Sequence, residues 1–209
     1  MRERVCPWWI GWALASPLRK VFYNPRSILQ PFVTEGMTVV EPGPGMGFFT
    51  KELARLVGST GKVIAIDIQP KMLSTLRGRL ERNGLADRVE LRLADAAGMH
   101  LNDMKNKVDF VLAFAMAHEV PDQKGFFKEL AESMKYSGKM LVSEPAWHVR
   151  EADFVQTINC AKQAGLVIER KPAIRSNHSV LLMSTADENC TFLAGENCTP
   201  KPRGDELSL

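Results

Sequence analysis

The stretch Glu41-Pro-Gly-Pro-Gly-Met-Gly47 decides the fold of this 209-residue chain. It follows a short apolar run typical of a β-strand and precedes a helical pattern over 47–57. A strand that turns through glycines into a helix brings backbone N–H groups and a helix N-terminus close to a bound nucleotide. The stretch therefore predicts a nucleotide site at Gly43, Gly45 and Gly47 in an α/β protein.

Strand and helix patterns alternate along the chain after this turn. Further helical patterns cover 70–83, 122–136 and 151–164. Candidate strands, bounded by turn residues, lie at 38–41, 63–67, 89–93, 108–113, 139–144, 166–170 and 179–184. Repeated strand, helix, strand order predicts a parallel sheet with helices on both faces. The link between the last two strands is too short for a helical crossover, so we expect them to form an antiparallel hairpin.

The chain length predicts one domain, because 209 residues bury one core but not two of ordinary size. We expect a helical lid or substrate segment over 1–35, a cofactor-binding domain over 36–184 and a poorly ordered tail over 185–209. The N-terminus has the basic and then apolar order of a secretion signal. Three tryptophans and a proline make a poor signal core, so we expect this segment to stay in the mature protein.

Composition excludes few function classes. The chain is 45% hydrophobic and 24% charged, and no apolar run is long enough for a membrane span. The formal charge of +3 comes from scattered residues, so nucleic acid is not indicated as a partner. The four cysteines have neither disulfide nor zinc-ligand spacing. We therefore expect a cytoplasmic protein without a structural metal.

Three acidic residues narrow the choice of cofactor. Asp67 ends the second strand, where a carboxylate accepts hydrogen bonds from ribose hydroxyls; this feature is shared by S-adenosylmethionine and NAD sites. Asp95 follows the third strand and is placed to accept from an adenine amino group. Glu41 precedes the glycines, where dehydrogenases generally have no acid. Together these residues favour S-adenosylmethionine, although Asp67 and Asp95 are also compatible with solvated strand ends or helix caps.

The segments 39–48, 63–68 and 93–96 resemble the first three motifs of class I S-adenosylmethionine-dependent methyltransferases, and 110–122 looks like the fourth. The resemblance covers roughly residues 36–184. It is similar to the branch containing ubiquinone/menaquinone C-methyltransferases and arsenite methyltransferases. It implies a Rossmann-like sheet of seven strands in the order 3-2-1-4-5-7-6, with strand seven antiparallel, and S-adenosylmethionine as cofactor.

The resemblance also implies roles for single residues. Glu41 would orient the turn near the methionine amino group, and Asp67 would hold the ribose. The other implied cofactor-binding residues contact the adenine or line the methionine side: Ile68, Asp95, Ala96 and Phe114. The family often has Asp at the position of Glu41, and its glycine loop commonly lacks the proline found here at Pro44.

Two histidines are candidates for accepting a proton from the methyl acceptor. His118 follows the fourth strand, and His148 follows the fifth. Because the carboxyl ends of parallel strands carry the ligand crevice, both are expected near the acceptor, with Glu144 as a neighbour of either. The alternative is that His118 caps the following helix. A base is needed only where the nucleophile carries a proton.

Several acceptor classes are disfavoured. The fourth strand lacks the Asn/Asp-Pro-Pro-Tyr/Phe motif of enzymes that methylate amides and exocyclic amines. The fifth strand is followed by Glu144-Pro145 rather than Asp-Asn, so the magnesium ion of catechol-type enzymes is not expected. Arsenite chemistry usually employs more cysteines than Cys6 and Cys160.

Trp8, Trp9 and Trp12 lie along one side of a predicted N-terminal helix, where class I enzymes commonly place a lid over the substrate. Core packing or a dimer contact explains them equally well. A lid would indicate a small apolar or aromatic acceptor. We therefore expect a methyltransferase for such an acceptor, with a homodimer as one option. The alternatives are an NAD(P)-dependent oxidoreductase and a non-catalytic S-adenosylmethionine-binding protein.

Overall fold

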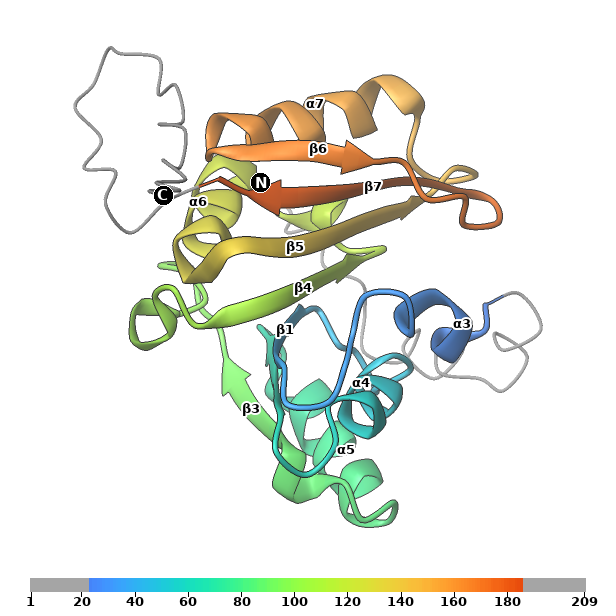
Figure 1. Ribbon diagram of the computed structural model, residues 1–209, viewed down its shortest axis with the longest axis vertical. Coiled ribbons are helices and arrows are strands. Elements are labelled where there is room, and N and C mark those ends of the chain that lie inside the picture. Colours follow the sequence, from blue (N-terminus) through green and yellow to red (C-terminus); the bar gives the residue numbers. More distant parts are fainter. Residues whose placement is uncertain (1–22, 186–209) are drawn as a thin grey trace, which may run out of the picture.

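The computed structural model describes residues 23–185 of the chain (Figure 1). The strands are β1 (Thr38–Pro42), β2 (Lys62–Asp67), β3 (Val89–Leu93), β4 (Val108–Phe114), β5 (Met134–Pro145), β6 (Leu166–Arg170) and β7 (Asn177–Ser184). The α-helices are α3 (Pro25–Leu29), α4 (Thr50–Leu56), α5 (Pro70–Glu81), α6 (Gln123–Ser133) and α7 (Glu151–Gln163). Three short 3-10 helices are η1 (Ala86–Arg88), η2 (Asn102–Met104) and η3 (Ala117–Glu119).

The strands form one seven-stranded sheet in the order β3-β2-β1-β4-β5-β7-β6. Neighbouring strands from β3 to β5 are parallel, whereas β7 is antiparallel to both β5 and β6. The predicted fold class, strand order and terminal hairpin are therefore confirmed. The parallel arrangement brings the carboxyl ends of β1, β2 and β4 to one edge, which is where the candidate site lies.

Each face of the sheet carries its own hydrophobic core. Successive strand residues point to opposite faces, so Val39 packs with α4 and α5 while Val40 packs with α6 and α7. Figure 1 shows α4 and α5 beside the β1–β3 part of the sheet, and α7 beside β6 and β7. Strands covered on both faces are apolar at almost every position, as in the fully buried β2 segment Val63–Ala65.

The predicted helix over 122–136 ends earlier than expected. Helix α6 stops at Ser133, and Met134 begins β5 by pairing with Val108 of β4. Met134 is fully buried, so its pairing and packing outweigh the helical pattern of the next residues. The predicted helix over 47–57 begins later, at Thr50, because residues before it form the turn that follows β1.

Several predictions concern residues outside the described range 23–185. These are the predicted signal-like segment, the lid tryptophans Trp8, Trp9 and Trp12, and almost all of the predicted tail. Within the described range, no helix is long and apolar enough to cross a membrane. The described part of the 1–35 segment contributes α3, whose Leu29 is buried in the core beside β1.

Candidate active site

The glycine turn lies at one end of a large cavity. Gly43 and Gly45 line it, and a Cβ added at Gly45 would meet no atom within 4 Å, so this backbone is open to a ligand. Gly43 instead allows close packing, because a Cβ there would lie 3.0 Å from the Cβ of Met116. Gly47, also predicted to bind cofactor, does not line the cavity. It faces Leu76 of α5 and has a φ of 82°, so its role is to let the turn pack on that helix.

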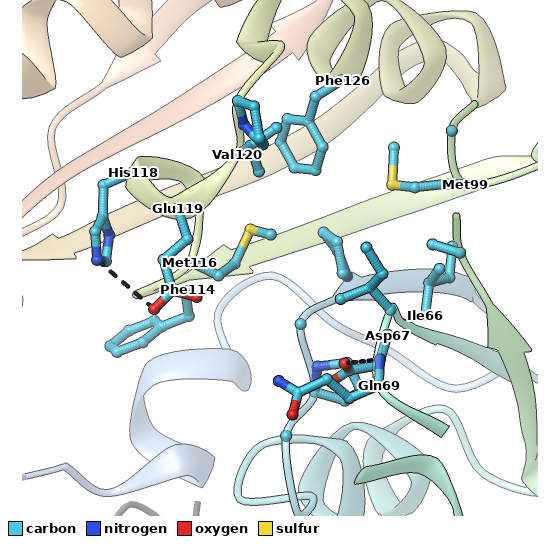
Figure 2. A pocket seen from close by; sticks show the side chains of 18 of the residues that line it. Ile66, Asp67, Gln69, Met99, Phe114, Met116, His118, Glu119, Val120 and Phe126 are labelled. Carbon is cyan, nitrogen blue, oxygen red and sulfur yellow. Dashed lines mark hydrogen bonds and ion pairs between the residues drawn. The ribbon is translucent and has the colours of Figure 1, made fainter. Parts of the chain in front are cut away.

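Asp67 is placed at the cavity wall by the end of β2. It is only 8% exposed, and its Oδ1 accepts a hydrogen bond from the backbone N–H of Gln69 at 2.9 Å (Figure 2). Burial raises the pKa of Asp67 to about 6, although neighbouring backbone amides act in the opposite direction. Ile68, the next residue, lines the same cavity and is 45% exposed. This pair therefore offers a carboxylate beside an apolar surface.

Asp95 and Ala96 line the cavity from the loop after β3. Asp95 is exposed: its Oδ1 accepts from the N–H of Ala97 at 2.7 Å, and its Oδ2 lies 3.0 Å from Nε2 of His100. The amide of Ala97 and the His100 side chain hold the pKa of Asp95 below its usual range. Because His100 also lines the cavity, Asp95 meets a ligand there only in competition with this histidine.

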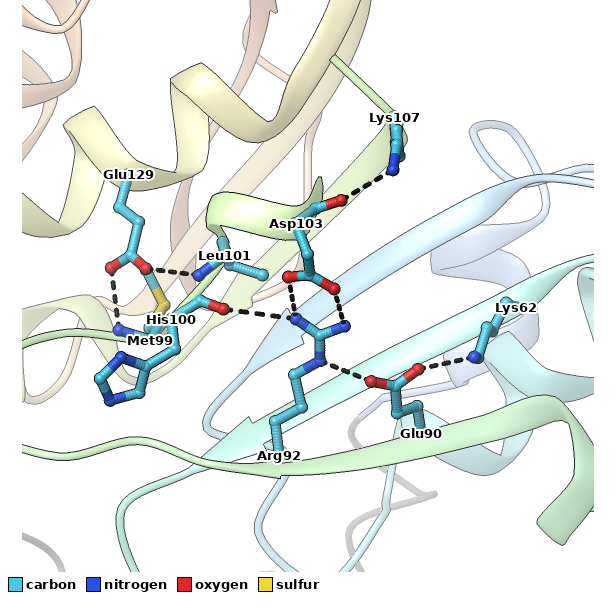
Figure 3. A network of polar contacts seen from close by, with 9 residues as sticks. All are labelled: Lys62, Glu90, Arg92, Met99, His100, Leu101, Asp103, Lys107 and Glu129. Atoms are coloured by element: carbon cyan, nitrogen blue, oxygen red, sulfur yellow. Dashed lines mark hydrogen bonds and ion pairs between the residues drawn. The ribbon is translucent and has the colours of Figure 1, made fainter. Parts of the chain in front are cut away.

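The loop after β3 is fastened by residues that the sequence did not single out. Glu129 of α6 accepts hydrogen bonds from the N–H groups of Met99 and Leu101 at 2.8 and 2.7 Å (Figure 3). Arg92 of β3 donates two hydrogen bonds of 2.7 Å to Asp103 at the other end of the loop. These contacts fix the backbone that carries the predicted adenine-binding residues. No local sequence signal indicates them, since the partners are far apart along the chain.

Glu41 lies behind the cavity wall, although it was predicted to bind cofactor. Its side chain is 4% exposed, and its Oε2 has no hydrogen-bond partner within residues 23–185. Burial raises the pKa of Glu41 to about 7; the Thr50 hydroxyl lowers it, and the charge of Asp67 raises it further. A buried carboxylate oxygen without a partner is costly, so a polar ligand group or water reaching it would be stabilising.

His118 lines the polar end of the cavity, and Glu144 lies fully buried behind it. His118 comes from η3 after β4, and Glu144 comes from the end of β5. Nδ1 of His118 lies 2.7 Å from Oε2 of Glu144. Nε2 of His118 lies 3.9 Å from Oε1 of Glu119 (Figure 2). Burial works to lower the pKa of His118, but the hydrogen bond and charge of Glu144, together with Glu119, outweigh it and raise the pKa. The His148 ring lies 5.0 Å from that of His118.

Aromatic side chains surround this polar end. Phe114, predicted to line the methionine side, lines the cavity and makes an edge contact with Tyr23 at 5.5 Å. Tyr23 is held by its hydroxyl, which donates to Oδ1 of Asn177 at 2.6 Å. Trp147 lines the cavity and is 79% exposed. One residue of the segment before β1, Tyr23, therefore lines the cavity.

The glycine turn and the histidines share one cavity of about 1070 Å³. This volume lies at the upper end of the roughly 300–1,000 Å³ that is usual for a ligand pocket. Cys160, considered for arsenite chemistry, lies on α7 against the core and not among the residues lining this cavity. Among residues 23–185, no group of three His, Cys, Asp or Glu side chains is arranged to hold a metal ion.

Residues 33–192 match the family model described as "Methyltransferase domain". The chain belongs to this family. The match supports the expected class I S-adenosylmethionine-dependent methyltransferase, with S-adenosylmethionine as cofactor, over the oxidoreductase alternative. A solved structure of a SAM-dependent methyltransferase from Aquifex aeolicus covers 86% of this chain and 99% of its own, with a TM-score of 0.77 and 25% identity.

Curated relatives agree with the family. The ubiquinone/menaquinone biosynthesis C-methyltransferase UbiE of Hahella chejuensis is 34% identical over 113 residues, which are 54% of this chain and 44% of that protein. The arsenite methyltransferase of Halobacterium salinarum is 25% identical over 177 residues, which are 82% of this chain and again 44% of the relative. The chain therefore spans less than half the length of these two relatives.

The site fits S-adenosylmethionine. The backbone at Gly45 is open to a ligand, Asp67 offers a carboxylate at the cavity wall, and Glu41 has a buried oxygen without a partner in residues 23–185. A ligand with ribose hydroxyls and a charged amino group supplies the donors that such carboxylates need.

Proposed function

We propose that this methyltransferase domain transfers a methyl group from S-adenosylmethionine to a small organic acceptor bound between His118 and His148. The observation that carries the proposal is the single cavity joining the glycine turn to these histidines. A cofactor on the turn and an acceptor at the histidines would be neighbours without any rearrangement of the sheet. Holding two reactants in contact is the main requirement of this reaction.

Cofactor binding is assigned to the glycine turn and to residues at the ends of the neighbouring strands. Asp67 accepts hydrogen bonds from the ribose hydroxyls, and Ile68 packs against the adenine. Gly45 allows the ligand to approach the backbone, Gly43 lines the cavity beside it, and Glu41 acts from beneath the turn. Asp95, Ala96 and Phe114 complete this set. When bound, S-adenosylmethionine supplies a methyl group on a positively charged sulfur, which is already activated toward nucleophiles.

At the other end of the cavity, we assign one side chain as the base for the acceptor and others as the apolar surface that contacts it. His118 is the proposed base, because Nδ1 is held by Glu144 while Nε2 makes no hydrogen bond to Glu119 at 3.9 Å. His148 is the second polar contact. The aromatic walls at Phe114 and Trp147 favour an apolar or aromatic acceptor. Trp8, Trp9 and Trp12, which were predicted to form a lid, lie outside residues 23–185, so their role stays a prediction.

The test is a pair of measurements on the whole chain. Calorimetric titration with S-adenosylmethionine, S-adenosylhomocysteine and NAD should show micromolar or tighter binding of the first two and none of the third. A screen of small hydroxylated and aromatic metabolites with methyl-labelled S-adenosylmethionine should then identify an acceptor. If neither S-adenosylmethionine nor S-adenosylhomocysteine binds, the proposal is wrong. Tight binding without transfer to any acceptor would favour the non-catalytic alternative.

Two further expectations await their own measurements. Gel filtration with light scattering decides whether the chain forms a homodimer, which the sequence leaves as one option. Fractionation of cells that express the chain decides its expected cytoplasmic location.

A further inference from the structure

Glu144 is a fully buried carboxylate, and both of its oxygens contact the short segment Ala117–His118. Oε2 lies 2.7 Å from Nδ1 of His118, and Oε1 accepts from the backbone N–H groups of Ala117 at 2.8 Å and His118 at 3.3 Å. One carboxylate thus holds both the backbone and the ring of His118. Burying a carboxylate costs free energy unless hydrogen bonds or an opposite charge compensate it, and these contacts provide that compensation.

The arrangement fixes the tautomer of His118. A carboxylate only accepts hydrogen bonds, so the proton of the neutral ring lies on Nδ1 and the lone pair lies on Nε2. His118 lines the cavity, and Figure 2 shows it on the same side as Phe114 and Met116. If Nε2 gains a proton, the resulting cation lies between the carboxylates of Glu144 and Glu119. The site is therefore built to receive one proton.

Aromatic residues line the cavity together with His118. His148 stands nearly perpendicular to His118, with ring centroids 5.0 Å apart, and Trp147 lies 5.3 Å from His148. Trp147 is 79% exposed, and a large exposed aromatic at a cavity rim is typical of a ligand contact. Tyr23 and Phe114 form an edge contact on the cavity wall. Aromatic walls favour a planar ring, which they contact by stacking or by edges.

We infer that the methyl acceptor is a phenol, that Nε2 of His118 takes its hydroxyl proton, and that Glu144 is the positioning residue for this base. The inference rests on the proposed methyl transfer. The phenol O–H bond breaks, its electron pair stays on the oxygen, and the proton forms an N–H bond on Nε2. The phenolate is then the nucleophile, and the imidazolium later returns the proton to water. Glu144 neither gives nor takes this proton; it holds the ring through Nδ1.

The experiment uses 4-nitrophenol, whose phenolate absorbs visible light and whose neutral form does not. The full chain is first saturated with S-adenosylhomocysteine, and binding of both ligands is measured by calorimetry. Bound 4-nitrophenol should be more ionised than free 4-nitrophenol at the same pH. In Glu144→Gln, the ionised fraction relative to the neutral one should fall about tenfold or more, because a contacting opposite charge is lost. His118→Gln should abolish the increase.

The matched control is His178→Gln. His178 pairs with Glu144 in the sheet register but stacks on Phe154 and does not line the cavity, so its replacement should leave the phenolate signal unchanged. A thermal melt of each variant reports folding; should Glu144→Gln not fold, His118→Gln supplies the decisive comparison. 4-Nitroanisole, which has no hydroxyl proton, should bind equally well to the chain and to the Glu144→Gln variant.

The outcomes separate the two proposals. Failure of S-adenosylhomocysteine to bind defeats the proposed function itself. If it binds but 4-nitrophenol does not, or binds only in its neutral form, the phenol inference is overturned while methyl transfer stands. A phenolate signal that survives both Glu144→Gln and His118→Gln also overturns it. Loss of that signal in both variants, with S-adenosylhomocysteine affinity and the melt retained, supports it.

Discussion

The two ends of the cavity are built in different ways. The turn end uses residues near the ends of β1, β2 and β3, and much of its surface is backbone, as at Gly43 and Gly45. The histidine end uses side chains from distant elements: Tyr23 before β1, His118 after β4 and Glu144 of β5. Backbone contacts suit a ligand shared by a whole family, whereas side chains can be replaced one at a time. This difference fits the proposal that the first end binds the cofactor and the second binds the acceptor.

The largest expected effect tests the histidine end. His118→Ala should lower kcat by roughly 10²–10⁴-fold, the usual contribution of a general base, and should leave S-adenosylhomocysteine affinity nearly unchanged. Steady-state rates on the identified acceptor and a calorimetric titration check this. A loss confined to KM would indicate acceptor positioning. Full activity would exclude His118 as the base and remove the distinction between the two ends; the helix-cap alternative does not apply, because Asp122 is the N-cap of α6.

The next effect concerns the charge buried beneath the turn. Glu41 has a folded pKa of about 7 against an ordinary value of 4.5, so the folded chain binds more protons than the unfolded chain between these values. The contribution of Glu41 to stability without cofactor is therefore fully present below pH 4.5 and is lost as the pH rises to 7. The total should be about 3 kcal/mol for Glu41, at 1.36 kcal/mol per pKa unit.

Denaturant unfolding of the chain and of Glu41→Gln across this pH range measures the Glu41 contribution as the difference between the two curves. Asp67, with a pKa of about 6, adds a similar slope to both curves and cancels in the difference. Parallel curves would mean that Glu41 is compensated in the folded chain and that the turn end holds no such unpaired charge.

A smaller effect is expected at Asp67, where two substitutions are compared. Asp67→Ala should weaken S-adenosylhomocysteine binding by about 1–3 kcal/mol, because ribose hydroxyls would face a site without their acceptor. Calorimetry on the variant measures the loss. Asp67→Asn, which keeps one acceptor oxygen, should lose less than the alanine variant. Unchanged affinity in both would make Asp67 only a strand end.

The smallest effect is expected at Asp95. This carboxylate is exposed and already accepts from Ala97 while contacting His100, so a ligand gains little by replacing these contacts. Asp95→Ala should reduce affinity for S-adenosylhomocysteine by about two- to fivefold, less than Asp67→Ala. The same titration series decides the order. A larger loss at Asp95 than at Asp67 would reverse the ranking of the two strand ends.

Short-range patterns predicted much of the fold and part of the site. Apolar runs located all seven strands, and the missing crossover between the last two predicted the antiparallel β6–β7 hairpin. Strand ends also located Asp67, Asp95, His118 and His148 on one cavity, because parallel strands of a single sheet end at the same edge. These features are encoded locally, in backbone preference and in position along a strand.

Tertiary structure decided the rest, because side-chain partners depend on register and packing across elements. The His118–Glu144 contact joins η3 to β5, and the hydrogen bonds of Glu129 join the 94–101 loop to α6. Gly47 belongs to the same turn as Gly45 but packs on α5. The side chain of Glu41 is buried behind the cavity wall and does not line it. The sequence by itself determined which residues reach the cavity edge; only packing determined which of them face the ligand and which hold the others in place.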